Sequence, residues 1–424
     1  MQQSSFIQRA VIIFGIVMAL MMTISLIAPA VTRNTSTQQD EPTSVPTPPP
    51  PTLPPPMTDF SGITFDEDYL HPSGLYWVSV PTGWSSAQPL NNGTQAQITL
   101  NNPNVLSVIQ IYIEQPQPPL ASTDDLEARF ARGMLDSSWS QFRGGSTELT
   151  RSVVDGRLVI EFLLKDASGI QYQAKHIAWF DEDWLYVVRI VVPSNAGALL
   201  TFLENTMPDQ IHPNKQFAGT PVIWQGEYDI ADKHIFRHPP AWVFTDGGVG
   251  LPSSYESTAP DGVKLLVESQ DGTIPDEAAA RDWVTSRHSA AEVMGVTTTT
   301  RIGGEGFFVT YGYQNPDGES LSGAAVLLNG EDGKLHTADL NLPVAGVDLN
   351  NPEDRAAYEE VAQALDTFSL LTGLRLPTPP TPTPEPTATI EPTTEVELTP
   401  EATPQVEATP ETTPEATAEA SSGS

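Results

Sequence analysis

The chain contains no cysteine among its 424 residues. Disulfide bonds, thiolate zinc sites, iron–sulfur clusters, thiol nucleophiles and lipidation of an N-terminal cysteine are therefore excluded. Domains of about 150 residues bury enough apolar surface to fold without such cross-links. An oxidising compartment permits disulfides without requiring them, so their absence says little about where the protein resides.

Basic residues are also scarce, because 20 Lys and Arg stand against 53 Asp and Glu, which gives a net charge of −33. A chain of this charge repels nucleic acid and anionic lipid surfaces, so neither is expected as a partner. The acidic residues occupy the middle of the chain as well as its C-terminal tail. A solvated surface that keeps the protein soluble explains them better than a specific cation site.

Catalytic signatures are missing too, since the sequence holds no G-x-S-x-G elbow, H-E-x-x-H helix, P-loop or EF-hand loop. His234 and His238 fall in a predicted strand, where their Cα atoms lie about 13 Å apart, too far to share a metal ion. The glycine clusters at 247–250 and 303–306 lack the following helix of a phosphate site, and the acids at 181–183 suit a hairpin turn. We predict no catalytic, cofactor-binding or metal-binding residue, and no enzyme.

One long apolar run is present, from Ala10 to Val31, with Arg9 and Arg33 on its flanks. It carries no charge and exceeds the roughly 20 residues that a membrane-spanning helix needs. The small residues at 28–30 suit a signal peptidase, but the run is longer than an ordinary signal core. We predict a single-pass anchor that leaves the remaining chain on the extracytoplasmic side. The alternative is a secreted protein after signal cleavage.

Proline and threonine dominate the segments that flank the central part of the chain. Residues 32–58 are rich in both and predict an extended, polyproline-like linker. Residues 374–424 repeat Thr-Pro and Pro-Glu units without aromatic residues, which predicts a disordered tail. A glycosylated stalk, a spacer, a weak interaction segment and a solubilising end remain alternative roles for this tail.

An internal repeat organises the central part of the chain. Tyr76–Trp84 (YWVSVPTGW) and His234–Trp242 (HIFRHPPAW) both end in Pro-x-x-Trp, and a strand pattern follows each, at 105–113 and 263–269. Trp84 and Trp242 occupy equivalent places in the repeat. We therefore predict that both plug hydrophobic cores, although a sugar-stacking surface shared with Trp179 and Trp184 is the alternative.

Each copy continues with a helix, a meander of strands and a second helix. The first helices are predicted to start at Asp124–Glu127 and at Thr273–Asp276, and the second after Ser194 and after Asn351. Turns rich in Asp, Asn and Gly separate the intervening strands. This order predicts an α+β fold in which helices pack on antiparallel sheets, an α/β sandwich.

The strand endings at Pro81–Trp84 and Pro239–Trp242, with the meander and terminal helix that follow, resemble the PsbP/Mog1-like superfamily. The resemblance implies tandem PsbP/Mog1-like α/β-sandwich domains in a membrane-anchored extracytoplasmic bacterial protein. Members of that superfamily are mostly binding and assembly modules rather than enzymes. The chain lacks a lipobox cysteine, and no photosystem role is transferred to it.

The sequence thus predicts six segments: a short N-terminal segment at 1–9, a transmembrane helix or signal at 10–31, a linker at 32–58, α/β-sandwich domains at 62–213 and 220–373, and the tail at 374–424. The predicted function is a membrane-anchored binding or assembly module, acting through a sheet face or a groove between domains, with an envelope or membrane protein as partner. The alternative is a cell-envelope hydrolase or glycan-active enzyme with a dispersed carboxylate site.

Overall fold

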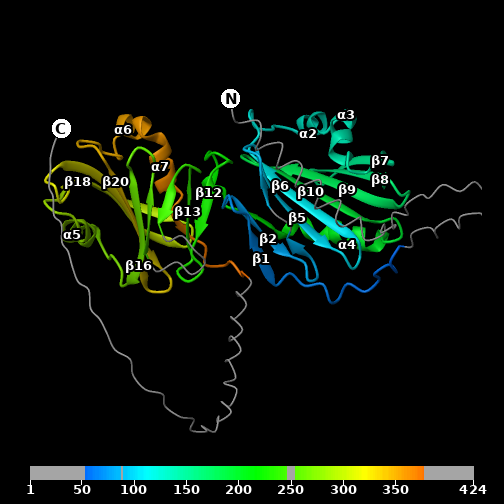
Figure 1. The fold of residues 1–424 in the computed structure, drawn as a ribbon, viewed down its shortest axis with the longest axis horizontal. Coiled ribbons are helices and arrows are strands. Elements are labelled where there is room, and N and C mark those ends of the chain that lie inside the picture. The colour runs from blue at the N-terminus through cyan, green and yellow to red at the C-terminus, as the bar shows by residue number, and fades with distance from the viewer. Residues whose placement is uncertain (1–52, 87–88, 246–253, 377–424) are drawn as a thin grey trace, which may run out of the picture.

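The structure is a computed structural model that describes residues 53–86, 89–245 and 254–376. The fold is β-rich and sandwich-like, with mostly antiparallel sheets and few helices (Figure 1). Within the described residues, no helix is long and apolar enough to cross a membrane. The predicted anchor at 10–31, most of the linker and nearly all of the tail lie outside the described residues.

The N-terminal half contains an eight-stranded and a three-stranded sheet, in the orders β3-β5-β6-β10-β9-β8-β7, with β4 beside β5, and β1-β2-β11. Its strands are β1 Glu67–Leu70, β2 Tyr76–Val80, β3 Ser85–Ser86, β4 Leu90–Asn91, β5 Gln95–Asn102, β6 Ser107–Glu114, β7 Gly145–Val154, β8 Arg157–Lys165, β9 Gln171–Phe180, β10 Leu185–Pro193 and β11 Ile211–Pro213. Its α-helices are α2 Thr123–Arg129, α3 Arg132–Leu135 and α4 Gly197–Thr206, and the 3-10 helices are η1 Asp136–Trp139, η2 Met207–Gln210 and η3 Lys215–Phe217.

The C-terminal half contains a seven-stranded sheet in the order β14-β15-β16-β20-β19-β18-β17 and a three-stranded sheet in the order β12-β13-β21. Its strands are β12 Gln225–Tyr228, β13 His234–His238, β14 Val243–Thr245, β15 Ser254–Thr258, β16 Lys264–Asp271, β17 Glu292–Arg301, β18 Gly304–Gln314, β19 Ser320–Gly330, β20 Lys334–Leu342 and β21 Ser369–Leu370. Its helices are α5 Glu277–Arg287, α6 Pro352–Ala357 and α7 Glu359–Asp366. The strands of the two halves therefore follow the same order.

Alternating side chains give each large sheet two buried faces. In β8, every second residue from Leu158 to Leu164 is buried in a core that includes residues of α2, α3 and η1. In β6, Ile109, Ile111 and Ile113 belong to a core on the opposite face, closed by α4 and the small sheet. The C-terminal half repeats the arrangement, with α7 and its small sheet on one face and α5 on the other.

Helix starts agree with the sequence only in part. Asn351 caps α6 with Pro352 in its first turn, as predicted. The first helix of the N-terminal half is capped by Ser122, whose side chain forms a capping box with Asp125, so the predicted cap was two residues too late. The predicted cap at Ser194 is wrong, because α4 begins after Ala196 with no side-chain cap.

Both tryptophans of the Pro-x-x-Trp motif are buried, as the sequence predicts. Trp84 is 6% exposed in the core of the N-terminal half, and Trp242 is 5% exposed in the core of the C-terminal half. Trp184 is also buried, whereas Trp179 is half-buried and stacks on Tyr186 with ring centroids 5.2 Å apart. These four residues therefore offer no shared exposed surface for stacking a sugar.

Candidate functional site

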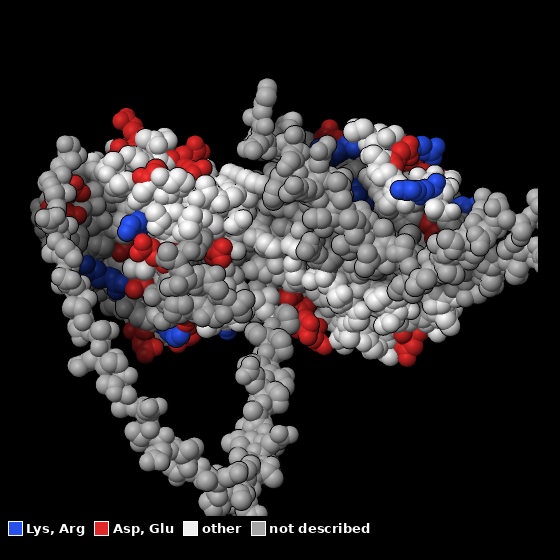
Figure 2. Space-filling model, viewed as in Figure 1, with Lys and Arg blue, Asp and Glu red and all other residues white. Residues whose placement is uncertain are grey.

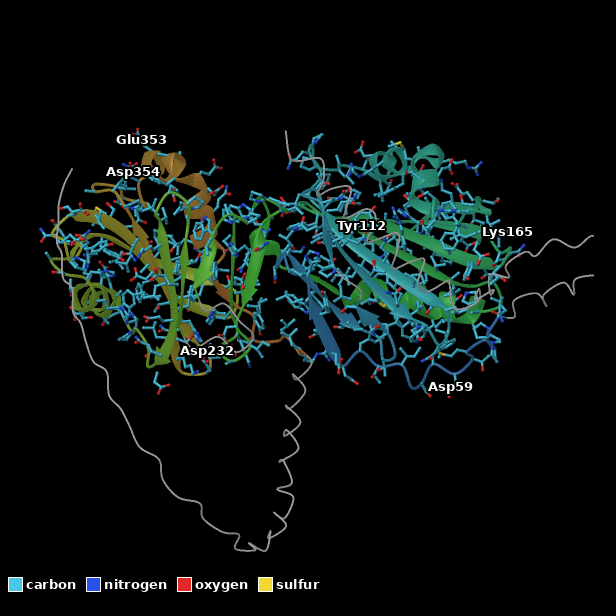
Figure 3. All side chains as sticks on the ribbon, in the orientation of Figure 1. Asp59, Tyr112, Lys165, Asp232, Glu353 and Asp354 are labelled. Atoms are coloured by element: carbon cyan, nitrogen blue, oxygen red, sulfur yellow. The ribbon has the colours of Figure 1, made fainter. Side chains whose placement is uncertain are left out.

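A groove of about 800 Å³ lies in the N-terminal half, where strands β5, β6 and β10 meet the helices α2 and α3. Tyr112 lies on the sheet beneath these helices (Figure 3), and the surface around them carries both acidic and basic side chains (Figure 2). Gln95, Tyr112, Glu114 and Arg189 of these strands form the floor of the groove. Strand pairing brings them together, because Glu114 lies between Gln95 and Leu185, and Arg189 lies opposite Gln110. On this face β6 carries Gln110, Tyr112 and Glu114, so the part of the sheet under the groove is polar or amphipathic.

An ion pair occupies one end of the floor. The Arg129 guanidinium, at the end of α2, pairs with the buried carboxylate of Glu114. Gln95 Nε2 donates a further hydrogen bond to Glu114 Oε2 at 3.0 Å. The charge of Glu114 is therefore balanced within the groove, and its oxygens already accept two donors.

Arg189 occupies the other end of the floor and contacts neutral acceptors. Its Nε donates to His176 Nδ1 at 3.2 Å, its Nη1 to Gln110 Oε1 at 3.1 Å and its Nη2 to Ser138 Oγ at 3.1 Å. The guanidinium carbon also lies 5.3 Å from the Tyr112 ring centroid. Among the described residues, no carboxylate lies within ion-pair distance of Arg189.

The groups around Arg189 do not compensate its charge. Burial lowers the pKa of His176 well below its usual value, and the neighbouring arginines lower it further. A neutral His176 that accepts at Nδ1 carries its proton on Nε2. Burial raises the pKa of Tyr112 to about 12, so its hydroxyl stays protonated at neutral pH. The guanidinium of Arg189 therefore remains a net positive charge in the floor.

Apolar side chains form the walls of the groove. Pro118, Pro119 and Leu120 line one side, and Ala128 and Met134 line the helical side. Met134 is 66% exposed. Met134 follows Phe130 at helical spacing, a pattern that predicts a shared buried face, but the helix breaks between α2 and α3 and Met134 is exposed.

A smaller hollow of about 240 Å³ adjoins Trp242 in the C-terminal half. Asp261 and Glu360 lie on its rim, and Ala259, Pro260 and Val361 supply apolar contacts. Among the residues that the structure describes, no Lys, Arg or His lines it. It therefore offers less varied chemistry than the groove of the N-terminal half.

The candidates considered from sequence do not gather into a site. His238 Nδ1 lies 2.8 Å from the carbonyl of Pro239, whereas His234 Nδ1 lies 3.4 Å from Ser269 Oγ, so the two histidines have different neighbours. Asp181 caps its hairpin turn by accepting from the backbone of Trp184 at 3.0 Å. Gly303 has a φ of 74° and makes the turn between β17 and β18, and residues 247–250 lie outside the described residues. Nowhere in the described ranges do three or more metal-ligating side chains cluster.

A row of polar side chains in the C-terminal half was not expected from the sequence. Ser269 Oγ lies 2.9 Å from His336 Nδ1, and His336 Nε2 lies 3.3 Å from Asp332 Oδ1. His234 Nδ1 approaches the same hydroxyl at 3.4 Å. Ser269 and His336 come from β16 and β20, which pair in the sheet, so only the strand register brings them together.

The contact between the two halves is packed around Arg237. This side chain is fully buried, and its Nε and Nη2 donate to the carbonyls of Ser73 at 2.6 Å and Pro221 at 2.7 Å. A Cβ added to Gly226 would lie 2.7 Å from the Cα of Gly74, so the backbones touch there. The two halves therefore touch directly at these residues.

The chain beyond β21 adds a second contact. Arg375 forms an ion pair with Asp68 of β1, and the Asp68 N–H donates to the Arg375 carbonyl at 2.7 Å. The chain therefore still contacts the N-terminal half at Arg375, two residues beyond the predicted end of the second domain at 373. Burial of Asp68 opposes its ionisation, but the Arg375 and Ser79 hydrogen bonds outweigh it and lower the pKa of this carboxyl.

Comparison with known proteins gave no match to a family model and no match to a curated protein. Among solved structures, the cyanobacterial PsbP (CyanoP) from Synechocystis sp. PCC 6803 is similar, with a TM-score of 0.26, 17% identity, and coverage of 36% of this chain and 95% of that one. The apo immunity protein TplEi of the T6SS from Pseudomonas aeruginosa has a TM-score of 0.20, 13% identity and coverage of 68% and 97%. DynU16, from the dynemicin biosynthetic locus, has a TM-score of 0.12, 8% identity and coverage of 67% and 84%. The chain is thus weakly similar in structure to a PsbP protein.

Proposed function

We propose that the chain is a membrane-anchored extracytoplasmic binding module, built from two tandem PsbP/Mog1-like α/β-sandwich domains at 62–213 and 220–373. The uncharged segment Ala10–Val31 would anchor it and direct both domains outward. The repeated strand order supports two copies of one fold. The partner is an envelope or membrane component and not a nucleic acid, since the chain carries a net charge of −33.

The groove beside α2 and α3 carries the proposal. It combines exposed apolar walls with a polar floor, as ligand sites commonly do. Its two carboxylates are already engaged, because Glu114 pairs with Arg129 and Asp125 closes the capping box of α2. A glycan-cleaving pair needs one carboxyl to donate a proton and another to act as nucleophile or base. The groove therefore supports binding over hydrolysis.

A photo-crosslinking amino acid at Met134 tests the proposal in intact cells. Met134 is 66% exposed at the groove, and Met294, 41% exposed on β17, provides a matched control position. We expect a discrete ultraviolet-dependent adduct from position 134 and none from position 294. Identical adducts from both positions, or none from position 134, would contradict a ligand in the groove.

One observation favours the hydrolase as a second candidate. Ser269, His336 and Asp332 form a hydrogen-bonded row of the residue types that serve as nucleophile, base and orienting acid. Two features weigh against it. His234 shares the serine hydroxyl, and neither the groove nor the smaller hollow includes these residues.

Ser269→Ala separates the two candidates. A nucleophile would make hydrolysis of a p-nitrophenyl ester by the purified chain fall about a thousandfold or more in this variant. We expect instead that the parent chain and Ser269→Ala release p-nitrophenol at the same slow rate. Ser320→Ala, an exposed position on β19 outside the row, is the control for preparation effects. A rate that collapses in Ser269→Ala alone would establish the hydrolase.

A further inference from the structure

The floor of the groove holds the positive charge of Arg189 between apolar walls, and no carboxylate of the described part of the chain pairs with it. We infer that this groove binds an amphipathic aliphatic monocarboxylate, whose carboxylate pairs with Arg189 and whose hydrocarbon body lies along the walls. The inference rests on the proposed binding function and names the class of ligand.

The geometry of Arg189 leaves donors for such a ligand. A guanidinium carries five N–H groups. Three of them donate to His176, Gln110 and Ser138, and the guanidinium also interacts with the Tyr112 hydroxyl. Among the described residues all of these partners are neutral, and at least one N–H group remains for a ligand. These neighbours also hold the guanidinium in place, so little side-chain freedom is lost when a ligand binds. A carboxylate matches the two terminal nitrogens of an arginine in a bidentate pair.

The surrounding charges select an anion. Glu114 is neutralised by Arg129, and the carboxylate of Asp125 accepts from the hydroxyl of Ser122 at 2.9 Å and from two backbone N–H groups at the rim. Arg189 is half-buried, so its attraction for an anion is stronger than it would be in bulk water. The chain as a whole carries a net charge of −33, so the positive charge of this floor is opposite in sign to that of the chain.

The walls select an aliphatic body over a sugar ring. The aromatic residues of the groove, Tyr112 and Phe130, are only 3% and 6% exposed, so their faces are not free to stack on a sugar. The exposed apolar residues of the walls are Pro118, Pro119, Ala128 and Met134. Methionine is flexible and polarisable and adapts to aliphatic ligands of different shape.

Saturation-transfer NMR of the full-length chain with hexanoate tests the inference, with hexanamide as a neutral probe of the same length. We expect saturation transfer to hexanoate, about tenfold weaker binding of hexanamide, and a similar loss of hexanoate binding in Arg189→Gln. Arg151→Gln is the matched control, because Arg151 is half-buried on β7 of the same sheet but lies outside the groove. It should bind hexanoate within about twofold of the parent.

A second variant does not depend on the stability of the floor. Met134→Glu changes an exposed residue and places a negative charge at the apolar wall, so hexanoate binding should fall while hexanamide binding changes less. Equal binding of the two probes by the parent chain, or unchanged hexanoate binding in Arg189→Gln, would overturn the carboxylate assignment and leave a groove that binds neutral ligands. Absence of transfer to both probes, together with no crosslink at position 134, would overturn the binding function as well.

Discussion

Trp84→Ala is expected to lower the melting temperature of the N-terminal half by roughly 10 °C, which separates its unfolding from the single transition expected of the parent chain. The indole ring is 6% exposed and packs in a core with Tyr76, Val78 and Ile98. Truncation of a buried tryptophan to alanine costs about 3–5 kcal/mol, and about 1 kcal/mol shifts a domain of this size by roughly 2–4 °C. The indole nitrogen has no partner among the described residues, so the expected loss comes from packing alone.

Differential scanning calorimetry of the full-length chain measures this effect. Trp242→Ala, 5% exposed in the other core, should destabilise the C-terminal half by a similar amount. Trp179→Ala is the control, because Trp179 is half-buried and should cost less than either. If Trp84→Ala and Trp242→Ala both melt within about 1 °C of the parent, the two rings do not stabilise the cores. Their equivalent places in the two halves would then need another explanation.

The features that could be predicted from sequence are those that depend on short-range patterns. The alternation in Tyr76–Val80, the Pro-x-x-Trp ending and the Asp and Gly turns depend on neighbouring residues, and they describe the order of strands correctly. Short-range patterns did not fix the helix starts. Ser122, Asp124 and Asp125 are all residue types that cap helices, and the structure uses Ser122, with Leu126 buried in the core.

The groove could not be predicted because its residues come from distant segments. Arg189 lies within a run of valine and isoleucine in β10, where alternation alone predicts a half-buried strand residue. Its importance arises from Gln110, Ser138 and His176, which only the sheet register and the fold of η1 bring to it. The same holds for Ser269 and His336, which lie 67 residues apart in sequence.

Strand β13 shows a related limit. A pattern such as HIFRH predicts one buried and one exposed face, yet all five residues of His234–His238 are buried. The second face is covered because the N-terminal half packs on it, with Ile235 belonging to the N-terminal core. A contact between distant parts of the chain leaves no periodic signal in the sequence.

Arg237→Ala is expected to uncouple the two halves. The Arg237 side chain is fully buried, and it donates to Ser73 and Pro221 and to the Thr220 hydroxyl. Burial lowers the pKa of Arg237 to about 9, which reflects the unfavourable desolvation of its charge. Alanine would leave a cavity and acceptors without donors, and each orphaned buried group costs about 1–3 kcal/mol. The cavity and the orphaned acceptors together are expected to cost about 3–5 kcal/mol at the contact.

Calorimetry and limited proteolysis together report this loss. In the parent chain we expect the two halves to unfold together, since the contact is packed and includes the buried side chain of Thr220. In Arg237→Ala the two halves should melt in separate transitions, and protease should cut the connecting segment at 218–223 faster than in the parent. Arg237→Lys should give an intermediate result, because one ammonium cannot reproduce the planar fork of donors.

Arg281→Ala controls for removal of an arginine from the C-terminal half. Arg281 lies on the exposed surface of α5 and pairs with Glu277 four residues before it, an interaction worth about 0.3–0.5 kcal/mol. Its loss should leave both the melting profile and the cleavage of 218–223 unchanged. A single transition at the parent temperature in Arg237→Ala would mean that the Gly74–Gly226 contact and the Arg375–Asp68 pair suffice to hold the halves together. Arg237 would then fill space at the contact without stabilising it.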